Sequence, residues 1–142
     1  MDEQTTLFIN EMLPDEADIE KELRDYATEH RVPILRRDAA AFLRTLVTLK
    51  KPERILEVGT AIGYSAIIMS KASPESHIDT GEIDGDSVII ARQNIKKAGA
   101  EKKIRVIAED GNEVLSALTK PYDMIFIAAA KDQYIHLYDD VI

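Results

Sequence analysis

Hydrophobic positions follow helical spacing in the first third of the chain and then change character near residue 52. The early pattern predicts a short helix over 5–12, a second over 15–30, and a third that begins at an N-cap Asp38 and runs to Leu49. Pro33 makes the segment before the third helix extended, and Pro52 prevents that helix from continuing. We expect residues 1–51 to form a helical segment that packs on the same domain as the rest.

After residue 52, short apolar runs alternate with amphipathic stretches. The predicted strands span 54–58, 77–82, 103–108 and 122–128; the predicted helices span 65–71, 86–98 and 112–118, with a last one from about residue 132. Such alternation implies right-handed crossovers and a parallel sheet, and hence an α/β fold. The run 124–127 is continuously apolar and predicts a strand buried on both faces. Asp79 and Gly81 fit a central strand less well.

The turn after the first predicted strand carries the most specific pattern in the chain. Glu57, Gly59 and Gly63 have the spacing E-x-G-x-x-x-G, and glycine allows both positive φ and close approach of a ligand to the backbone. This spacing differs from the G-x-G-x-x-G fingerprint, and the difference argues against an NAD-dependent oxidoreductase. No lysine follows the second glycine, which excludes a P-loop. A carboxylate there suits ammonium or hydroxyl groups, both of which S-adenosylmethionine carries. An ordinary βα turn remains the alternative.

Carboxylates follow three successive predicted strands, at Glu57, Glu82 and Asp110. Ligands of open parallel sheets lie beyond the carboxyl ends of the strands, so these positions converge on one site. Glu82 can accept hydrogen bonds from both ribose hydroxyls, Asp110 from the adenine amino group, and the Gly111 amide can reach a ring nitrogen. Any one acid among 26 can be a solvated loop residue, but their joint placement favours an adenosine site.

Composition limits the other possibilities. A chain of 142 residues predicts one domain, and the absence of cysteine excludes disulfides and thiolate chemistry within it. A net charge of −8 disfavours nucleic acid and anionic membranes, apart from a basic rim around Arg36, Arg37 and Arg44. No leader pattern and no apolar run long enough to span a bilayer occurs. We expect a cytoplasmic protein without a membrane partner.

The sequence resembles the class I S-adenosylmethionine-dependent methyltransferases. Within them it is similar to the metal-dependent O-methyltransferases that include the caffeoyl-CoA and catechol enzymes, and above all to their bacterial branch, some members of which methylate hydroxyuridine in tRNA. The likeness runs over about 32–138, and the stretch 57–65 is typical of the family. The motifs that carry it are residues 54–66, Glu82, Glu109-Asp110-Gly111 and residues 122–131.

The resemblance implies a Rossmann-like, doubly wound parallel sheet over 52–142, preceded by the N-terminal helices. A complete family member has three further strands, which we expect this chain to lack. It implies a homodimer and an S-adenosylmethionine-dependent O-methyltransferase acting on a catechol-like molecule or tRNA hydroxyuridine. The implied cofactor-binding residues are Glu57, Gly59, Thr60, Gly63, Ser65, Glu82, Ile83, Asp110 and Gly111.

The family also implies a divalent metal, Mg²⁺, that lowers the pKa of the acceptor hydroxyl, and a lysine that acts as general base. Lys131 matches that lysine, but Ala128 stands where the family has a metal-binding aspartate. Alanine has no side-chain oxygen to offer a hard cation, so we assign no metal ligand in this chain. The alternative is therefore an inactive or truncated methyltransferase-like domain that binds S-adenosylmethionine or S-adenosylhomocysteine without turnover.

Overall fold

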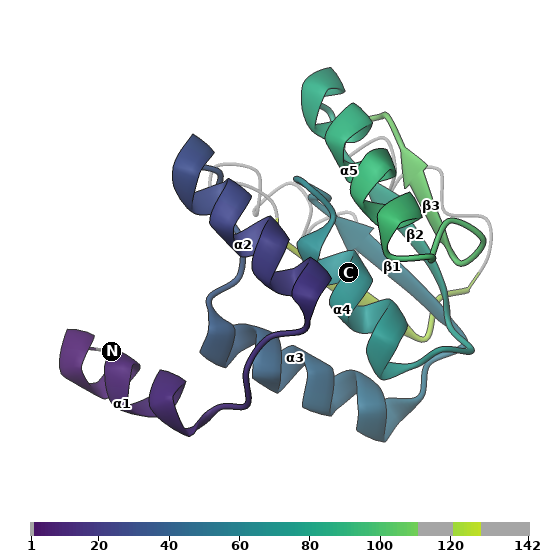
Figure 1. The fold of residues 1–142 in the computed structure, drawn as a ribbon. Helices are drawn as coiled ribbons and strands as arrows, with labels where there is room; N and C mark the ends of the chain where they lie inside the picture. Colours follow the sequence, from purple (N-terminus) through teal and green to yellow (C-terminus); the bar gives the residue numbers. More distant parts are fainter. Residues whose placement is uncertain (1, 111–120, 129–142) are drawn as a thin grey trace.

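A four-stranded parallel sheet is the frame of the structure, a computed structural model that describes residues 2–110 and 121–128 (Figure 1). The strands follow the order β3-β2-β1-β4, and every neighbouring pair is parallel. This confirms the predicted α/β class and parallel sheet. The strands are β1 (Arg54–Val58), β2 (His77–Gly81), β3 (Ile104–Ile107) and β4 (Met124–Ile127).

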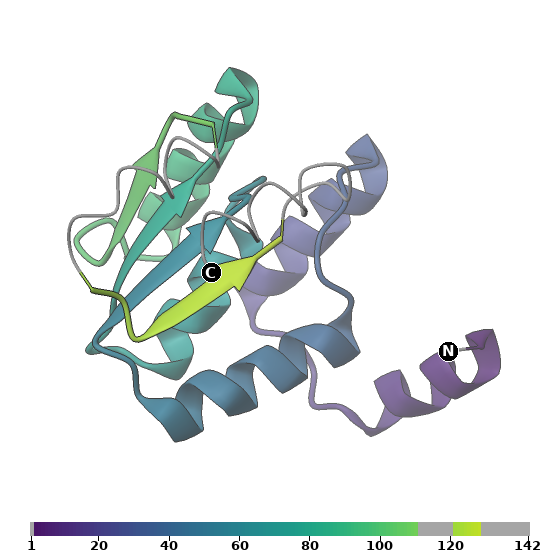
Figure 2. The ribbon, with the colours of Figure 1, turned by 180° about the vertical axis from the view of Figure 1, so that it is seen from behind.

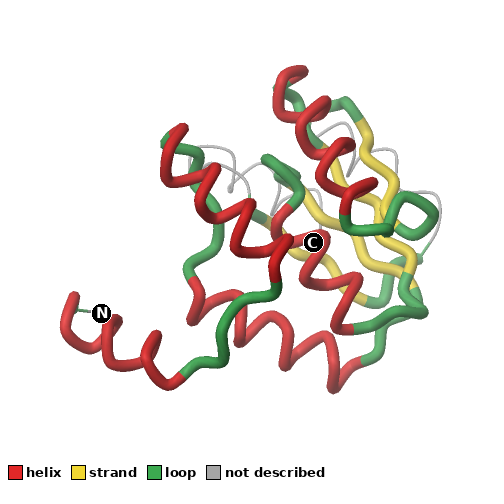
Figure 3. The backbone as a smooth tube through the Cα atoms, in the orientation of Figure 1, coloured by secondary structure: helices red, strands yellow, loops and turns green. Residues whose placement is uncertain are grey.

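Helices α4 (Tyr64–Ala72) and α5 (Gly85–Lys97) connect β1 to β2 and β2 to β3, and both pack on the same face of the sheet. Helices α2 (Asp18–His30) and α3 (Arg37–Lys50) pack in turn on α4, whereas α1 (Glu3–Met12) lies at the periphery and contacts α3 (Figures 1 and 3). Seen from behind, the sheet lies in front of α4 and α5 (Figure 2).

The alternation of side chains along the strands produces two apolar clusters. Ile55, Ile78 and Phe126 point to the helical face and join the main core, together with side chains from α2, α3, α4 and α5. Leu56 and Val58 point to the other face, where Ile107, Tyr122 and Ile127 pack against them.

The prediction that β4 is buried on both faces is wrong for the structure as described. Its residues are only half-buried, and Ile125 is 37 % exposed. The reason is the register: Ile125 lies opposite Leu56, on the face away from α4 and α5, and β4 pairs with β1 at the end of the four-stranded order.

The strand that fitted its sequence pattern least, β2, is confirmed as a central strand. Asp79 is tolerated there because its carboxylate accepts hydrogen bonds from Arg105 Nε at 3.0 Å and Tyr122 Oη at 2.7 Å and lies 3.4 Å from Arg54 Nη2. The Arg54 guanidinium also lies 4.4 Å from the centre of the Tyr122 ring. This half-buried acid is thus balanced by partners on three other segments.

Several helix ends differ from the predictions by a few residues, and the starts of α2 and α3 are instructive. The N-cap of α3 is Arg36, not Asp38, because Asp38 lies inside the first turn, where its carboxylate pairs with Arg36. Helix α2 begins at Asp18 instead of residue 15. By contrast, α5 lies within one residue of its predicted range, 86–98. Gly99 follows the end of α5 with φ +72°, and its amide donates to the Lys96 carbonyl.

The helices predicted over 112–118 and from residue 132 lie outside the described residues. Within the described ones, no helix is long and apolar enough to cross a membrane. The proposed single domain remains a prediction. What supports it is that Leu23 and Ala27 of α2, and Leu43 and Val47 of α3, belong to the same core cluster as the sheet.

If residues 1–51 fold as part of one domain, a cavity in α2 should destabilise the whole chain. Leu23 is 2 % exposed, so we expect Leu23→Ala to lower the free energy of unfolding by about 2–5 kcal/mol in a single transition. Chemical denaturation followed by circular dichroism measures this. Ile89→Ala, at a side chain that is 57 % exposed, is the control and should change stability by less than about 1 kcal/mol. Two separate transitions would contradict the single domain.

Candidate cofactor site at the carboxyl end of β1

The loop between β1 and α4 is closed by backbone hydrogen bonds to the end of β2. The amides of Gly59 and Thr60 both donate to the Gly81 carbonyl, at 2.9 and 3.1 Å, and the Gly63 amide donates to Thr60 O at 2.9 Å. Gly59 and Gly63 have φ values of +100° and +92°. A Cβ at Gly63 would meet only ordinary contacts of 3.5 Å, so the backbone angle, and not lack of space, requires glycine there.

Glu57 lies behind this loop and is fully buried. One carboxylate oxygen accepts a hydrogen bond from Ser65 Oγ on α4, and the other accepts from Thr80 Oγ1 on β2 at 2.6 Å. The Thr60 hydroxyl lies 2.6 Å from that of Thr80 and continues the chain of hydrogen bonds into the loop. One carboxylate therefore joins β1, β2, α4 and the loop.

The surroundings of Glu57 favour its protonated form. Burial raises the pKa of Glu57 from 4.5 to about 7, the hydrogen bonds from Ser65 and Thr80 oppose this rise, and the negative charge of Glu82 adds to it. Glu57 thus titrates near neutral pH.

Glu82 fastens the front of the same loop. Its carboxylate accepts hydrogen bonds from the Ala61 amide at 2.7 Å and from the Asp84 amide at 3.1 Å. Ala61 itself has φ +48°, a conformation that is costly for a residue with a Cβ and that this bond helps to hold. From α5, Asn94 Nδ2 donates to the Ile62 carbonyl at 2.9 Å.

A pocket of about 200 Å³ opens beside the loop, beyond the ends of β1 and β4. One wall is the loop with the start of α4, and the other is the extended segment between α2 and α3. The residues that line it are Pro33, Ile34, Leu35, Gly59, Thr60, Ala61, Tyr64, Ser65 and Ala128.

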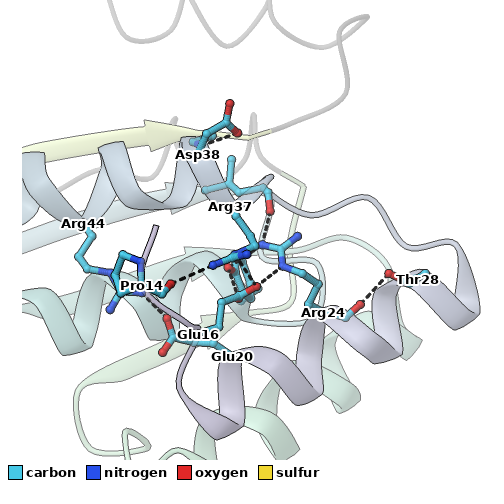
Figure 4. Close-up of polar contacts among 11 residues, drawn as sticks. Pro14, Glu16, Glu20, Arg24, Thr28, Arg37, Asp38 and Arg44 are labelled. Carbon is cyan, nitrogen blue, oxygen red and sulfur yellow. Dashed lines mark hydrogen bonds and ion pairs between the residues drawn. The ribbon is translucent and has the colours of Figure 1, made fainter. Parts of the chain in front are cut away.

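Polar side chains tie the two walls together (Figure 4). Arg24 of α2 donates through Nη2 to the Leu35 carbonyl at 2.8 Å and to Tyr64 Oη at 2.7 Å, and through Nε to Glu16. Tyr64 Oη in turn donates to Glu16 at 2.8 Å. The pocket therefore depends on the N-terminal helices as well as on the sheet.

A family model described as O-methyltransferase matches residues 10–142. The chain belongs to this family.

Curated relatives of the chain include a catechol O-methyltransferase of Niastella koreensis, 34 % identical over 68 % of this chain and 46 % of its own length. Another is a caffeoyl-CoA O-methyltransferase of Populus kitakamiensis, 32 % identical over 91 % of this chain and 59 % of its own length. The chain thus spans about half to three fifths of the length of these relatives.

Solved structures share the fold. The Podospora anserina methyltransferase, determined with S-adenosylhomocysteine bound, superposes with a TM-score of 0.87 at 24 % identity, over 99 % of this chain and 64 % of its own. The Bacillus cereus O-methyltransferase, also in complex with S-adenosylhomocysteine, gives 0.82 at 23 % identity, over 96 % and 67 %.

The structure places most of the predicted site residues around the loop between β1 and α4. Gly59, Thr60 and Ser65 line the pocket, and Gly63 begins α4. The others differ in exposure: Glu57 is fully buried, Glu82 and Asp110 are half-buried, and Ile83 is 65 % exposed. Gly111 and Lys131 lie outside the described residues.

Sequence analysis missed two residues that complete the site. Thr80 is the partner of Glu57 in the β1–β2 register, which becomes visible only once the strands are paired. Tyr64 follows directly after Gly63, but its role depends on Glu16 and Arg24, which are 48 and 40 residues away. Neither has a local sequence signal.

Ala128 lies at the end of β4, where its amide donates to the Val58 carbonyl at 2.8 Å and its side chain is exposed at the pocket. A methyl group offers no donor atom to a cation. Among residues 2–110 and 121–128, no three His, Asp or Glu side chains are grouped to hold a metal. The residues described therefore do not fit the divalent metal that the family implies.

The predicted basic rim consists of paired charges. Arg36 pairs with Asp38, Arg37 lies near Glu16 and donates to the Pro14 carbonyl, and Arg44 pairs with Glu20 (Figure 4).

A larger groove of about 570 Å³ between α5 and the start of β3 contains other cations, including Lys96, Lys102 and Lys103. This groove lies at the amino ends of the strands, opposite to the loop between β1 and α4, which is called the cofactor loop below.

The raised pKa of Glu57 predicts a specific pH dependence of stability. A folded-state pKa near 7 against 4.5 in the unfolded chain means that stability falls as pH rises between these values and is level above them. Glu57→Gln cannot ionise, so this fall should be absent. The shift of about 2.5 pKa units corresponds to a difference on the order of 3 kcal/mol. Urea denaturation between pH 4.5 and 8 measures it.

Glu75→Gln, at an exposed acid in the loop before β2, is the control for that measurement and should keep the slope of the native protein. An unchanged slope in Glu57→Gln would show that another group causes the pH dependence.

Proposed function

We propose that this chain transfers the methyl group of S-adenosylmethionine to a hydroxyl oxygen of its acceptor. The observation that carries the proposal is the loop after β1: two glycines at positive φ, closed by Glu82, beside a pocket at the carboxyl ends of parallel strands. Family membership and the S-adenosylhomocysteine found in two structures of the same fold support the same cofactor.

Each predicted residue has a proposed part in holding the cofactor. Glu82 uses one lone pair of each oxygen for the loop amides and keeps others for the ribose hydroxyls. Ile83 offers an exposed apolar surface to the adenine ring. Asp110 and the Gly111 amide would bind the adenine edge. Glu57 acts from behind the loop by orienting Ser65, which lines the pocket with Gly59 and Thr60, while Gly63 gives α4 its start.

In the reaction, a carbon–oxygen bond forms on the methyl group as its bond to sulfur breaks, and the acceptor loses its hydroxyl proton. Lys131 is the proposed base for that proton. The contribution of the pocket is to hold the acceptor oxygen in line with the sulfonium methyl, which lowers the barrier through orientation. A bound Mg²⁺ would add acidification of the hydroxyl, but the described residues do not supply its ligands.

Glu82 gives the first test of the cofactor assignment. We expect Glu82→Gln to weaken S-adenosylmethionine binding at least tenfold, because an amide presents one acceptor where the carboxylate presents two and one loop amide then faces an NH₂ group. Isothermal titration calorimetry measures the affinity.

The exposed Glu75→Gln change is again the matched control and should bind as the native chain does. No binding by the native chain at millimolar cofactor would overturn the cofactor assignment itself. Equal affinity of Glu82→Gln and the native chain would remove Glu82 from the site.

The acceptor is proposed as a small catechol-like molecule or a tRNA hydroxyuridine. Similarity to a catechol O-methyltransferase supports the first, and the pairing of Arg36, Arg37 and Arg44 with acids weakens one argument for the second. Transfer of labelled methyl to catechol and to tRNA, run side by side, distinguishes them. A cytoplasmic location remains a prediction.

A homodimer is also proposed. Apolar side chains on the outer faces of α1 and α3 are 42–77 % exposed, and a second copy of the chain is the proposed cover. Sedimentation velocity distinguishes dimer from monomer. The residues on this surface are Leu7, Phe8, Met12, Phe42, Leu46 and Leu49.

The alternative, a domain that binds the cofactor without turnover, is not favoured by the comparisons, yet Ala128 gives it a test. We expect Ala128→Asp to increase the stimulation of methyl transfer by Mg²⁺ several-fold, because it places a hard oxygen ligand at the pocket edge. Ala128→Asn, similar in size but uncharged, is the control. An equal Mg²⁺ response in the native chain would show that Ala128 does not limit the stimulation of methyl transfer by Mg²⁺. If every variant bound the cofactor without transferring the methyl group, the result would support the alternative.

A further inference from the structure

A closed set of polar contacts joins the N-terminal segment to the start of α4; it consists of Glu16, Arg24, Tyr64 and the Leu35 carbonyl, and is called the Arg24 cluster below. Arg24 donates to all three partners, and Tyr64 Oη donates back to Glu16 at 2.8 Å. The guanidinium carbon of Arg24 also lies 4.9 Å from the centre of the Tyr64 ring. Every member therefore contacts at least one other member, and Arg24 is the centre.

The members come from four segments of the chain. Glu16 precedes α2, Arg24 lies on α2, Leu35 lies in the extended segment before α3, and Tyr64 is the first residue of α4, directly after Gly63 of the cofactor loop. Leu35 and Tyr64 belong to opposite walls of the pocket, and Arg24 bonds to both with the same nitrogen. The width of the pocket is thus set by a side chain that does not line it.

The cluster is well shielded from water. The side chains of Arg24 and Glu16 are 24 % and 12 % exposed. Burial, with the nearby Glu16 acceptor, raises the pKa of Tyr64 to about 12, so its hydroxyl remains a donor at neutral pH. Charge-assisted bonds between an Arg and buried partners hold geometry better than surface pairs do.

A second arginine provides a matched comparison within the same helices. Arg44 of α3 pairs with the buried Glu20 of α2, which also lies 3.5 Å from Lys71 of α4. These contacts join α2 to α4, as the Arg24 cluster does, and also reach α3, but none of the three residues lines the cofactor pocket. Loss of Arg44 should affect the packing of helices without moving the pocket wall.

We propose that Arg24 is a positioning residue for the cofactor pocket: it holds the segment 32–35 against Tyr64 and so sets cofactor affinity without touching the cofactor. The proposal rests on the proposed function, because it takes the pocket beside the β1–α4 loop as the cofactor site. Linkage is reciprocal, so a bound cofactor must in turn stabilise the segment that Arg24 holds.

Three variants isolate this role. Arg24→Met removes the guanidinium but keeps an unbranched apolar stem. Arg24→Lys keeps the charge but replaces the planar guanidinium with a compact ammonium group, and Arg44→Met is the matched control. We expect S-adenosylhomocysteine affinity, by calorimetry, to fall about tenfold in Arg24→Met, less in Arg24→Lys, and no more than twofold in Arg44→Met. Denaturation curves of all three allow affinity to be compared at known stability.

Hydrogen exchange gives a readout that does not need the ligand. Without ligand, amides of 34–36 should exchange faster in Arg24→Met than in Arg44→Met, while amides of α5 behave alike in both. With S-adenosylhomocysteine, these amides should gain protection in the native chain.

Two results would overturn the proposal: equal loss of affinity in Arg24→Met and Arg44→Met, which indicates general destabilisation, or unchanged exchange at 34–36 in Arg24→Met. Failure of the proposed function appears differently, as absence of binding by the native chain together with normal exchange differences between the variants. In that case Arg24 still positions the segment, but the pocket it shapes is not the cofactor site.

Discussion

The buried carboxylate of Glu57 is the contact on which the cofactor loop depends. It lies at the end of β1, and its two oxygens hold a hydroxyl from α4 and a hydroxyl from β2. An isolated charge at such a position would cost several kcal/mol. The hydrogen bonds from Ser65 and Thr80 stabilise the charged form, and the raised pKa lets Glu57 become neutral by binding a proton near neutral pH. Because strand, strand and helix converge on one group, the turn between them has little freedom.

The pocket beside this loop has two walls of different origin. The loop wall is held by the sheet: the Gly81 carbonyl accepts hydrogen bonds from two loop amides, and the Glu82 carboxylate accepts one from a third. The facing wall, 33–35, belongs to an extended connection between helices and is attached through Arg24. Changes in the N-terminal helices can therefore reach this wall through the Leu35 carbonyl and the start of α4 through Tyr64. This is a physical reason for residues 1–51 to influence a site whose sequence motif begins at Glu57.

Sequence predicted the parts of the fold that depend on local pattern. The strand Arg54–Val58 and the positive φ at Gly59 and Gly63 follow from short-range chemistry. The errors and omissions involve distant partners. From the sequence alone Asp38 resembles an N-cap, but in the structure its carboxylate pairs with Arg36. Asp79 resembles a poor strand residue, but in the structure it accepts hydrogen bonds from Arg105 and Tyr122. Tyr64 gains its role from Arg24, which no spacing rule connects to it.

Charge pairing around the pocket bears on the kind of acceptor that suits it. The arginines nearest the N-terminal wall, Arg24, Arg37 and Arg44, each have a carboxylate from α2 or the loop before it within ion-pair distance. Arg24 and Arg37 share Glu16, however, and Lys71 shares Glu20 with Arg44, so these acids offset the local positive charge only in part. Repulsion of a polyanion therefore comes from the net charge of −8 on the whole chain, whereas a small, weakly charged hydroxyl compound would meet a narrow opening lined mainly by apolar side chains and backbone. Both observations support the proposal of a small acceptor over that of a tRNA.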